Sequence, residues 1–144
     1  MESKIFFENL TFDKRGQIIL LDVDGTLLPD GGLNFDSAVL RQLEKLKSNN
    51  RVFLCTNSGD IIRTKEIERM LDLPVVTYDH KKPSAKIINK LGIKKGSGDL
   101  LVIGDKILID GLFALNIGAR FIKIKRKISG KESIAVKLIN FLDD

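Results

Sequence analysis

The sequence predicts an α/β fold with three layers, in which five mainly parallel strands form one sheet with helices on both faces. Two observations support this fold class. Short runs rich in Val, Ile and Leu alternate along the chain with longer segments of helical period. The runs are also apolar throughout, as in Ile18–Leu21 and Leu100–Ile103, which is typical of strands buried on both faces. Strands that alternate with helices are joined by right-handed crossovers, so neighbouring strands run parallel.

The expected elements follow one another in chain order. The strands are Gln17–Asp22, Arg51–Cys55, Pro74–Thr77, Leu100–Ile103 and Arg120–Lys125. The helices lie between and after them, at residues 36–49, 60–72, 83–92, 110–117 and 131–142. In the first helix the apolar side chains share one face, and they are Val39, Leu40, Leu43 and Leu46. Asp36 and Ser37 stand where they can cap the start of that helix.

Length and composition are typical of one ordinary globular domain, which we expect to span residues 1–144. Hydrophobic residues make up 43% of the chain and charged residues 30%, which argues against a disordered or fibrous protein. The longest nearly apolar run, Gln17–Leu21, is too short to cross a bilayer, and residues 1–4 lack the features of a signal peptide. A single cysteine, Cys55, excludes an internal disulfide. We therefore expect a cytoplasmic, reducing location.

The chain carries a net charge of +5, and much of the excess lies near its C-terminal end. The basic cluster there comprises Lys123, Lys125, Arg126, Lys127 and Lys131. Such a cluster attracts anionic partners such as nucleic acid, a lipid headgroup or a phosphorylated substrate. No aromatic side chains interleave with these charges, as a surface for single-stranded nucleic acid would require, so a solvated lysine-rich surface is the favoured interpretation.

Polar and charged side chains follow four of the five predicted strands. In chain order they are Asp22 and Asp24, Thr56 and Asn57, Lys82, and Asp105 with Asp110. In open parallel sheets, ligands bind beyond the carboxyl ends of the strands. We therefore expect these groups to meet at one edge of the sheet.

The charges at that edge predict a metal ion. The four carboxylates expected there belong to Asp22, Asp24, Asp105 and Asp110. Like charges so close repel by on the order of several kcal/mol, so some must be neutralised. One divalent cation and Lys82 balance three of them if Asp24 holds a proton. The ligands are all oxygen, with no His or Cys among them, so we expect Mg²⁺. Asp22 and Asp24 are candidate ligands, Asp105 would bind the ion, and Asp110 would be a further ligand or a support.

The same groups suit hydrolysis of a phosphate monoester through a covalent intermediate. We expect Asp22 to attack phosphorus, and Asp24 to protonate the leaving oxygen and then to deprotonate the attacking water. Thr56 would hold the phosphoryl group through its hydroxyl, with Asn57 as its neighbour in the substrate site. Lys82 would supply a fixed positive charge to the phosphate and to Asp22.

These residues resemble, in order, the four motifs of the haloacid dehalogenase (HAD) superfamily of phosphatases. The matching segments are Asp22–Thr26, Thr56-Asn57, Lys82-Pro83 and Gly104-Asp105 with Asp110. Each short motif alone is weak, but four in order after predicted strands are specific. The resemblance covers residues 18 to about 118. It implies a Rossmann-like fold, Mg²⁺ as cofactor, and the backbone carbonyl of Val23 as one more metal ligand.

A narrower likeness is to the capless HAD group that includes phosphatidylglycerophosphate phosphatases. It rests on the stretch from Gly104 to Gly118, on Lys81-Lys82-Pro83 and on the short chain. HAD enzymes often insert a cap domain after the first or second motif. The chain between Asp24 and Thr56, and between Asn57 and Lys82, leaves no room for one. An uncovered site suits a large substrate or one that a second subunit of a homo-oligomer helps to enclose.

Several alternatives stay open at this stage. Asp110 could simply cap the following helix, Lys82 could be a solvated lysine, and Thr56 could end a strand. A calcium loop is excluded because the required glycine and glutamate would fall at Leu27 and Leu33. The substrate could be a phosphorylated lipid headgroup, with peripheral contact to a membrane, a sugar acid or a nucleotide. A nucleic-acid end phosphatase and a non-catalytic binding protein are the two alternatives of other kinds.

Overall fold

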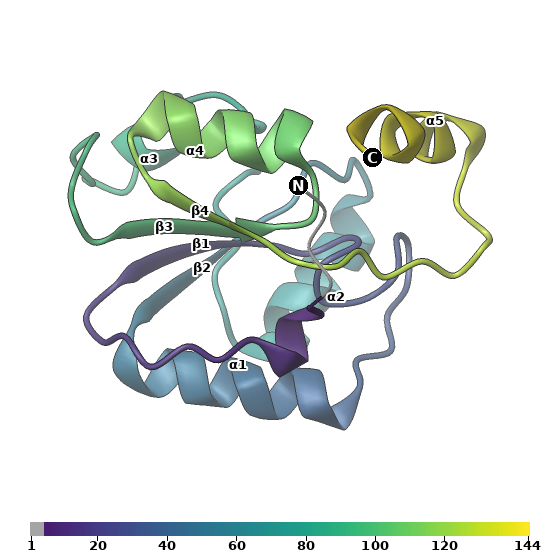
Figure 1. Ribbon diagram of the computed structural model, residues 1–144, viewed down its shortest axis with the longest axis horizontal. Coiled ribbons are helices and arrows are strands. Elements are labelled where there is room, and N and C mark those ends of the chain that lie inside the picture. Colours follow the sequence, from purple (N-terminus) through teal and green to yellow (C-terminus); the bar gives the residue numbers. More distant parts are fainter. Residues whose placement is uncertain (1–4) are drawn as a thin grey trace.

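The computed structural model describes residues 5–144, and within them a parallel sheet is covered by helices on both faces (Figure 1). Residues 1–4, which carry part of the prediction that no signal peptide is present, lie outside the described residues. Within the described range the sheet has four strands in the order β2-β1-β3-β4, and each pair of neighbours is parallel. The strands are β1 (Ile18–Asp22), β2 (Arg51–Cys55), β3 (Leu100–Gly104) and β4 (Arg120–Lys123).

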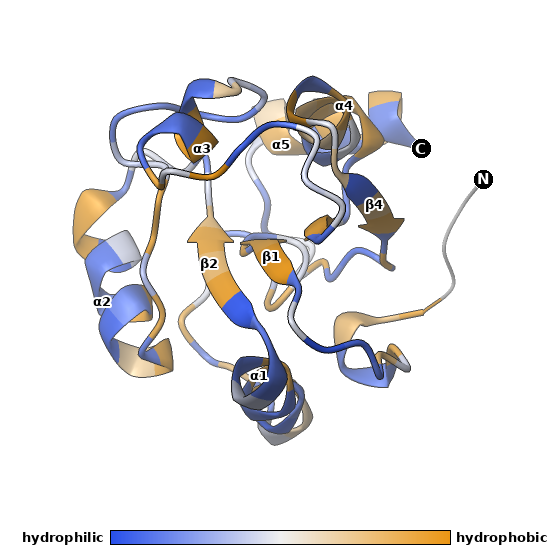
Figure 2. Cartoon of the chain, turned by 90° about the vertical axis from the view of Figure 1, so that its left-hand side faces the viewer, coloured by the Kyte–Doolittle hydropathy of each residue, from blue (hydrophilic) through white to orange (hydrophobic). Residues whose placement is uncertain are grey.

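The helices are arranged in two layers around the sheet. They are the 3₁₀ turn η1 (Phe7–Asn9), α1 (Ser37–Asn49), α2 (Ile61–Leu71), α3 (Lys86–Asn89), the π-helical turn η2 (Ile107–Gly111), α4 (Leu112–Ile117) and α5 (Ile134–Asp143). Helices α1 and α2 lie on one face of the sheet, and α3 and α4 lie on the other (Figures 1 and 2). The predicted α/β, Rossmann-like fold is confirmed.

Alternate residues of β1 are buried in the cores on opposite faces of the sheet. Ile19 and Leu21 belong to the core shared with α1 and α2, whereas Leu20 belongs to the core shared with α3 and α4. Each such side chain stabilises the fold by about 1.5–3 kcal/mol through its burial. The chain leaves β1 toward β2 on one side, while β3 lies on the other side. The strand order therefore reverses beside the end of β1, where a binding site is expected.

The prediction of a strand at Pro74–Thr77 is wrong, and with it the count of five strands. The segment contacts the sheet through a single parallel bridge between Leu54 and Val75. The next rung is made by a side chain, because the Thr77 hydroxyl accepts from the Thr56 N–H at 3.0 Å and donates to the Thr56 carbonyl at 2.5 Å. Because the Thr77 side chain bonds Thr56 where backbone groups would be needed, the pairing of this segment with β2 ends after one bridge.

The helix predicted at 83–92 is reduced to α3, a single turn. The reason is its hydrogen bonding: the Ile87 N–H donates to the Ser84 carbonyl, and the Leu91 N–H donates to the Ile88 carbonyl. These bonds span three residues instead of four, which is the tighter 3₁₀ pattern that does not extend into long helices. The chain here forms consecutive turns instead.

Other boundaries shift by a few residues. The predicted strand Arg120–Lys125 ends at Lys123, because the Lys125 N–H leaves the sheet and donates to the Ile5 carbonyl at 2.6 Å. The helix predicted at 110–117 is preceded by η2, which starts at Ile107. Asp36 precedes α1 as predicted, but its side chain accepts no hydrogen bond from the helix start. Leu40, expected on the apolar face of α1, is exposed.

The connections that could hold a cap domain are short, as predicted. Between Asp24 and Thr56 the structure contains α1, and between Asn57 and Lys82 it contains α2. No cap domain is therefore inserted at either point. Among residues 5–144, no helix combines the length and the apolar character that crossing a membrane would demand.

Candidate active site

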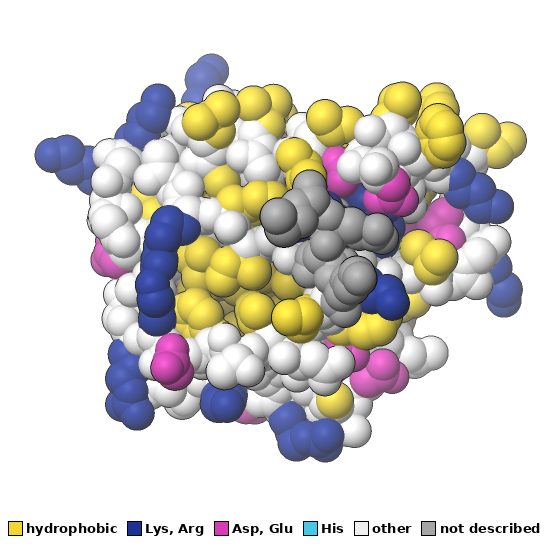
Figure 3. Space-filling view, viewed as in Figure 1, with side chains coloured by type: hydrophobic (Ala, Val, Ile, Leu, Met, Phe, Trp, Pro, Cys, Tyr) yellow, Lys and Arg dark blue, Asp and Glu magenta, His cyan; other side chains and the backbone are white. Residues whose placement is uncertain are grey.

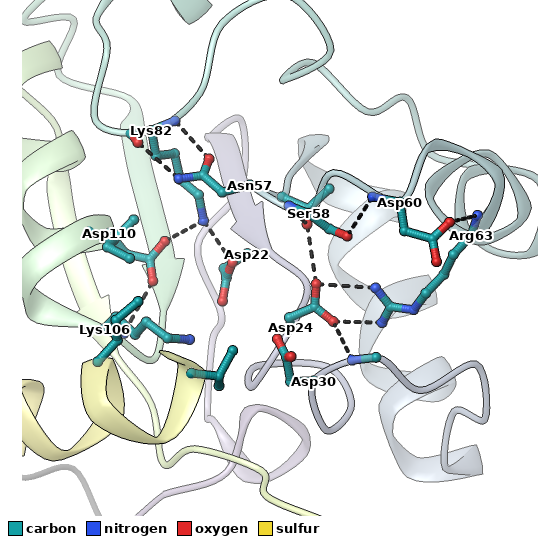
Figure 4. A pocket seen from close by; sticks show the side chains of 15 residues that line it. Asp22, Asp24, Asp30, Asn57, Ser58, Asp60, Arg63, Lys82, Lys106 and Asp110 are labelled. Carbon is teal, nitrogen blue, oxygen red and sulfur yellow. Dashed lines mark hydrogen bonds and ion pairs between the residues drawn. The ribbon is translucent and has the colours of Figure 1, made fainter. Parts of the chain in front are cut away.

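The side chains singled out in the sequence lie at the carboxyl edge of the sheet, and Figure 4 shows Asp22, Asp24, Asn57, Lys82 and Asp110 among them. Asp22 is the last residue of β1, Thr56 follows β2, and Asp105 follows β3. Lys82 comes from the loop before α3, and Asp110 comes from η2. The strands place three of these residues, whereas the other two arrive on loops and turns from the α3–α4 side of the sheet.

Lys82 is the buried cation at the centre of the site. Its Nζ lies 2.7 Å from Asp22 Oδ1 and 2.6 Å from Asp110 Oδ1, and the residue is only 6% exposed. Burial by itself would lower the pKa of Lys82, but the carboxylates of Asp110 and Asp22 raise it above its usual value. Lys82 is therefore charged at any physiological pH, and it is not a solvated surface lysine.

The backbone of Lys82 is fixed by Asn57. The Asn57 amide donates to the Lys82 carbonyl at 2.9 Å, and its oxygen accepts from the Lys82 N–H at 2.8 Å. Asn116 adds a bond to the carbonyl of Pro83 at 2.8 Å. Both polar groups of the Asn57 side chain are used in this clamp. A positioning role is thus visible for Asn57, while its contact with substrate stays a prediction.

Three acids lie close enough to share one ion. Asp22, Asp105 and Asp110 each offer an oxygen atom, and these atoms lie within 4.8 Å of one another. Burial and the neighbouring charge of Asp110 raise the pKa of Asp22 well above its ordinary value, although Lys82 opposes the rise. Thr26 Oγ1 lies 2.8 Å from Asp22 Oδ2 and 3.3 Å from Asp105 Oδ1, and so it ties the two carboxylates together.

Asp105 is held by two cations that the sequence analysis did not assign. Lys106 Nζ lies 3.1 Å from its Oδ2, and Arg126 Nε lies 2.8 Å from the same atom. Burial raises the pKa of Asp105, but Lys106 and the hydrogen bonds outweigh it and keep this pKa below the usual range. Arg126 is one member of the basic cluster, and another, Lys127, pairs with Glu8 at 2.7 Å. Two members of the basic cluster thus form ion pairs within the protein, which weakens the nucleic-acid hypothesis.

The charge argument for a metal needs correction. It counted Lys82 as the sole cation beside the acids, whereas Lys106 and Arg126 also contact Asp105. The three buried acids therefore face Lys82, Lys106 and Arg126, but Arg126 also pairs with Asp143 and Asp144, so the charge count alone neither requires nor excludes an ion. What fits Mg²⁺ is the donor set: three carboxylate oxygens at mutual distances that one hard cation can bridge.

Two predicted metal ligands lie outside this set. The Val23 carbonyl accepts the N–H groups of Thr26 at 3.1 Å and Leu27 at 2.9 Å. A carbonyl with both lone pairs used inside a turn is not free to bind metal, so the geometry speaks against this ligand. The Asp24 side chain is likewise not one of the three clustered acids.

Asp24 turns instead toward Arg63, a residue of α2 (Figure 4). The Arg63 guanidinium makes a two-pronged contact, 2.6 Å to Asp24 Oδ1 and 3.2 Å to Oδ2, and its Nε donates to the Gly32 carbonyl at 2.8 Å. The Thr56 hydroxyl lies 3.3 Å from Asp24 Oδ2, and the Gly31 N–H donates to Oδ1 at 3.2 Å. Asp24 and Thr56 therefore meet as predicted, but in a subsite dominated by an unpredicted arginine.

A sequence signal for Arg63 was present. Arg63, Ile67 and Leu71 recur at four-residue spacing, and all three are buried on one face of α2. An arginine at a core-facing position requires a buried acid as partner. Lys106 and Arg126 offered no comparable periodic signal, since neither lies in a helix or strand.

Most of these groups line a cavity of about 360 Å³, whereas Asp105 and Arg126 lie behind its lining. Asp22, Lys82 and Asp110 form its floor, and Asp24 with Arg63 forms one side. Val136 and Ile139 of α5 also line it, so the C-terminal helix forms a wall of the site. A cavity with a charged, hydrogen-bonding floor and an apolar wall suits a phosphate attached to a less polar group.

Two solved structures share the fold of this chain. YfnB from Bacillus subtilis, assigned as a HAD hydrolase and solved bound to magnesium, aligns with a TM-score of 0.53 at 14% identity, over 75% of this chain and 86% of that chain. The core domain of a protein from Streptococcus pneumoniae TIGR4, assigned as a phosphoglycolate phosphatase, aligns with a TM-score of 0.50 at 20% identity, over 91% of this chain and 98% of that one. At such identities the likeness shows the fold alone.

Sequence comparison is more specific. No curated protein matches the chain closely enough to count as a relative. The model of the family described as mitochondrial PGP phosphatase, however, matches residues 7–129, which include every clustered acid and Lys82. The predicted likeness to HAD phosphatases, and within them to the phosphatidylglycerophosphate phosphatase group, is confirmed. The chain belongs to the mitochondrial PGP phosphatase family, a family of HAD-like phosphatases.

Proposed function

We propose that this phosphatase hydrolyses a phosphate monoester of a lipid headgroup with Mg²⁺, through an aspartyl-phosphate intermediate on Asp22. The observation that carries the proposal is the buried Lys82 that contacts Asp22 and Asp110 beside Asp105. A lipid phosphate is favoured over a sugar acid or a nucleotide by the PGP phosphatase family match and by the apolar wall of the cavity. The cytoplasmic location and the single domain stay predictions.

The first chemical step would form a bond from a carboxylate oxygen of Asp22 to phosphorus while the bond to the leaving alcohol breaks. Lys82 holds that carboxylate in place and supplies positive charge as negative charge gathers on the phosphoryl oxygens. Thr56, at the end of β2, lies where its hydroxyl can hold one of those oxygens. Fixed groups of this kind act without rearrangement during the reaction.

Asp24 would give a proton to the leaving oxygen and later take one from the water that attacks phosphorus and frees Asp22. Its side chain is held by Arg63 and by the Thr56 hydroxyl. A phosphoryl group that takes over this hydroxyl would remove one of those contacts. Substrate entry would in this way loosen Asp24 when its proton is needed.

Asp22, Asp105 and Asp110 are the residues that would hold Mg²⁺, because their oxygens are clustered and buried. When bound, the ion would supply positive charge to the phosphoryl oxygens and favour the ionised form of Asp22. Burial and the charge of Asp110 raise the pKa of Asp22, and a bound cation would oppose that rise.

The test is turnover of p-nitrophenyl phosphate and of phosphatidylglycerophosphate in detergent micelles, with Mg²⁺ or with EDTA. We expect activity with Mg²⁺ and none with EDTA. Asp22→Asn should lower the rate by at least about 10³-fold, whereas Asp13→Asn, a change at an exposed residue, should leave it unchanged. Mass spectrometry of acid-quenched protein should find one added phosphoryl group, which is absent from Asp22→Asn. Full activity of Asp22→Asn, or activity in EDTA, would refute the mechanism.

A further inference from the structure

The C-terminal helix is unusually apolar for its position. Seven of the ten residues in α5 are apolar: Ile134, Ala135, Val136, Leu138, Ile139, Phe141 and Leu142. None of the ten is buried. A helix of this composition is normally covered by other parts of a protein or by a membrane. The exposed face of α5 therefore calls for a partner.

One face of α5 attaches it to the rest of the molecule. Val136 and Ile139 line the cavity, and the Asp143 carboxylate accepts the N–H groups of Ile107 at 3.1 Å and Leu108 at 2.7 Å. Positions 136, 139 and 143 recur at three- and four-residue spacing, so they share one side of the helix. That side is the one turned toward the active site.

The opposite face carries a continuous apolar stripe. It consists of Ile134, Leu138, Phe141 and Leu142, which are 88%, 57%, 77% and 63% exposed. These positions again follow helical spacing, on the side away from the cavity. Figure 3 shows hydrophobic side chains gathered along this upper edge of the molecule, over α4 and α5. The stripe and the cavity wall are thus two sides of one helix.

Two lysines flank the stripe. Lys131 and Lys137 are exposed beside it, and within residues 5–144 their ammonium groups form no hydrogen bond or ion pair. The three neighbouring acids are engaged: Glu132 accepts from Ser129 and Gly130, and Arg126 pairs with Asp143 at 3.3 Å and with Asp144 at 2.8 Å. Free lysines at the edge of an apolar stripe are typical of helices that lie in the interface of an anionic bilayer.

We propose that the outer face of α5 docks the protein on a bilayer that contains anionic lipid. The stripe would enter the headgroup boundary, Lys131 and Lys137 would meet the lipid phosphates, and the inner face of α5 would bring the cavity to headgroup level. The part concerning substrate access rests on the function proposed above, whereas docking itself does not. A second copy of the chain is the less suitable occupant, because a two-fold contact would bring both sets of lysines into one interface.

The test is co-sedimentation with vesicles of phosphatidylcholine, with and without phosphatidylglycerol. We expect binding to the anionic vesicles, and a loss of at least about tenfold in the double variant Leu138→Ser/Phe141→Ser. Lys131→Gln/Lys137→Gln should lose binding to a similar degree and should lose its dependence on salt. Met70→Ser, which changes an exposed apolar residue of α2, is the matched control and should bind like the wild type.

The outcomes separate the two proposals. If the protein turns over p-nitrophenyl phosphate but sediments no better with anionic vesicles than alone, docking is wrong and the proposed reaction stands. If it binds the vesicles through α5 and hydrolyses nothing, docking stands and the proposed function is wrong. Light scattering provides a further check: a dimer that the Leu138→Ser/Phe141→Ser variant abolishes, without vesicle binding by the wild type, would assign the stripe to a second copy and overturn the proposal. Circular dichroism confirms that each variant folds.

Discussion

Two walls of the same cavity are built in opposite ways. At the sheet edge, Asp22, Lys82 and Asp110 are almost completely buried, and each makes more than one polar contact. On the other side, no residue of α5 is buried, and the helix is held mainly through Asp143 and the Arg126 guanidinium. The sheet edge shares its contacts with the core, whereas α5 depends on a few polar bonds at the surface.

This difference bears on how the work of the site is divided. Groups that stabilise developing charge must be fixed before the reaction, and burial at rigid strand ends provides this. A wall that a substrate must pass benefits from low local stability, because weakly attached segments open at small cost. We therefore expect substitutions at the sheet edge to affect global stability and chemistry, and substitutions at α5 to affect local order and access.

The largest effect should come from Lys82→Met, which removes the buried cation and leaves Asp22 and Asp110 without it. Because breaking a buried ion pair leaves an uncompensated charge, the free energy of unfolding should fall by about 3–5 kcal/mol. Urea denaturation in EDTA measures this loss, and Lys86→Met, at an exposed lysine of α3, is the control. A loss no greater than that of the control would remove the basis for calling the sheet edge a rigid, charge-balanced centre.

Arg63→Gln tests the subsite around Asp24. Loss of the two-pronged contact should misplace Asp24 and lower kcat by about ten- to a hundredfold for a phosphate with a poor alkyl leaving group. p-Nitrophenyl phosphate should suffer much less, because its leaving group needs little help from an acid. Arg69→Gln, at an exposed arginine of the same helix, should change neither rate. Equal losses for both substrates would indicate that Arg63 only supports the fold.

The outcome of sequence reasoning follows the same division. The strand ends were predictable because parallel strands bury continuous apolar runs and bring their carboxyl ends to one edge, so Asp22, Thr56 and Asp105 could be placed together from spacing alone. The strand at Pro74–Thr77 was not excluded by its composition. The Thr77 hydroxyl takes the place of a backbone group in pairing with Thr56. This is a tertiary contact, which no local sequence pattern reveals.

The cations that approach from other elements were harder to foresee. Arg126 lies 21 residues beyond Asp105 in the sequence, and nothing but the path of the chain after β4 brings the two together. A charge count that included Lys82 alone missed Arg126 and also passed over Lys106, which directly follows Asp105, so it was an incomplete basis for predicting a metal. The orientation of α5 could not be predicted either, because its apolar residues lie on nearly all sides and do not indicate which side faces the protein.

Asp143→Ala should loosen α5 and leave the sheet unchanged. The Ile107 and Leu108 amides lose their acceptor and Arg126 loses one partner, which should cost about 1 kcal/mol locally. Hydrogen exchange should show faster exchange at these two amides and in α5, with β1 and β3 unaffected. Asp144→Ala, which removes only a more exposed partner of Arg126, is the matched control. Faster exchange in β1 as well would mean that the two walls are not independent.

The smallest effect concerns the turn that leads into α5, where the Glu132 carboxylate accepts from the backbone N–H and the hydroxyl of Ser129 and from the Gly130 N–H. These bonds lower the pKa of Glu132 from 4.5 to about 2. The folded state thus favours the ionised form, so the stabilisation is complete above the unfolded pKa and is lost as the pH falls toward the folded one.

Glu132→Gln should therefore lower the free energy of unfolding at neutral pH by less than about 1 kcal/mol, since the turn lies at the surface. The difference from the wild type should shrink below the unfolded pKa of 4.5 and vanish near a pH of about 2. Glu44→Gln, at an exposed glutamate of α1, serves as the control. A difference that stays constant down to the lowest pH would mean that Glu132 acts through its shape and not through its charge, and that the turn before α5 is held by packing after all.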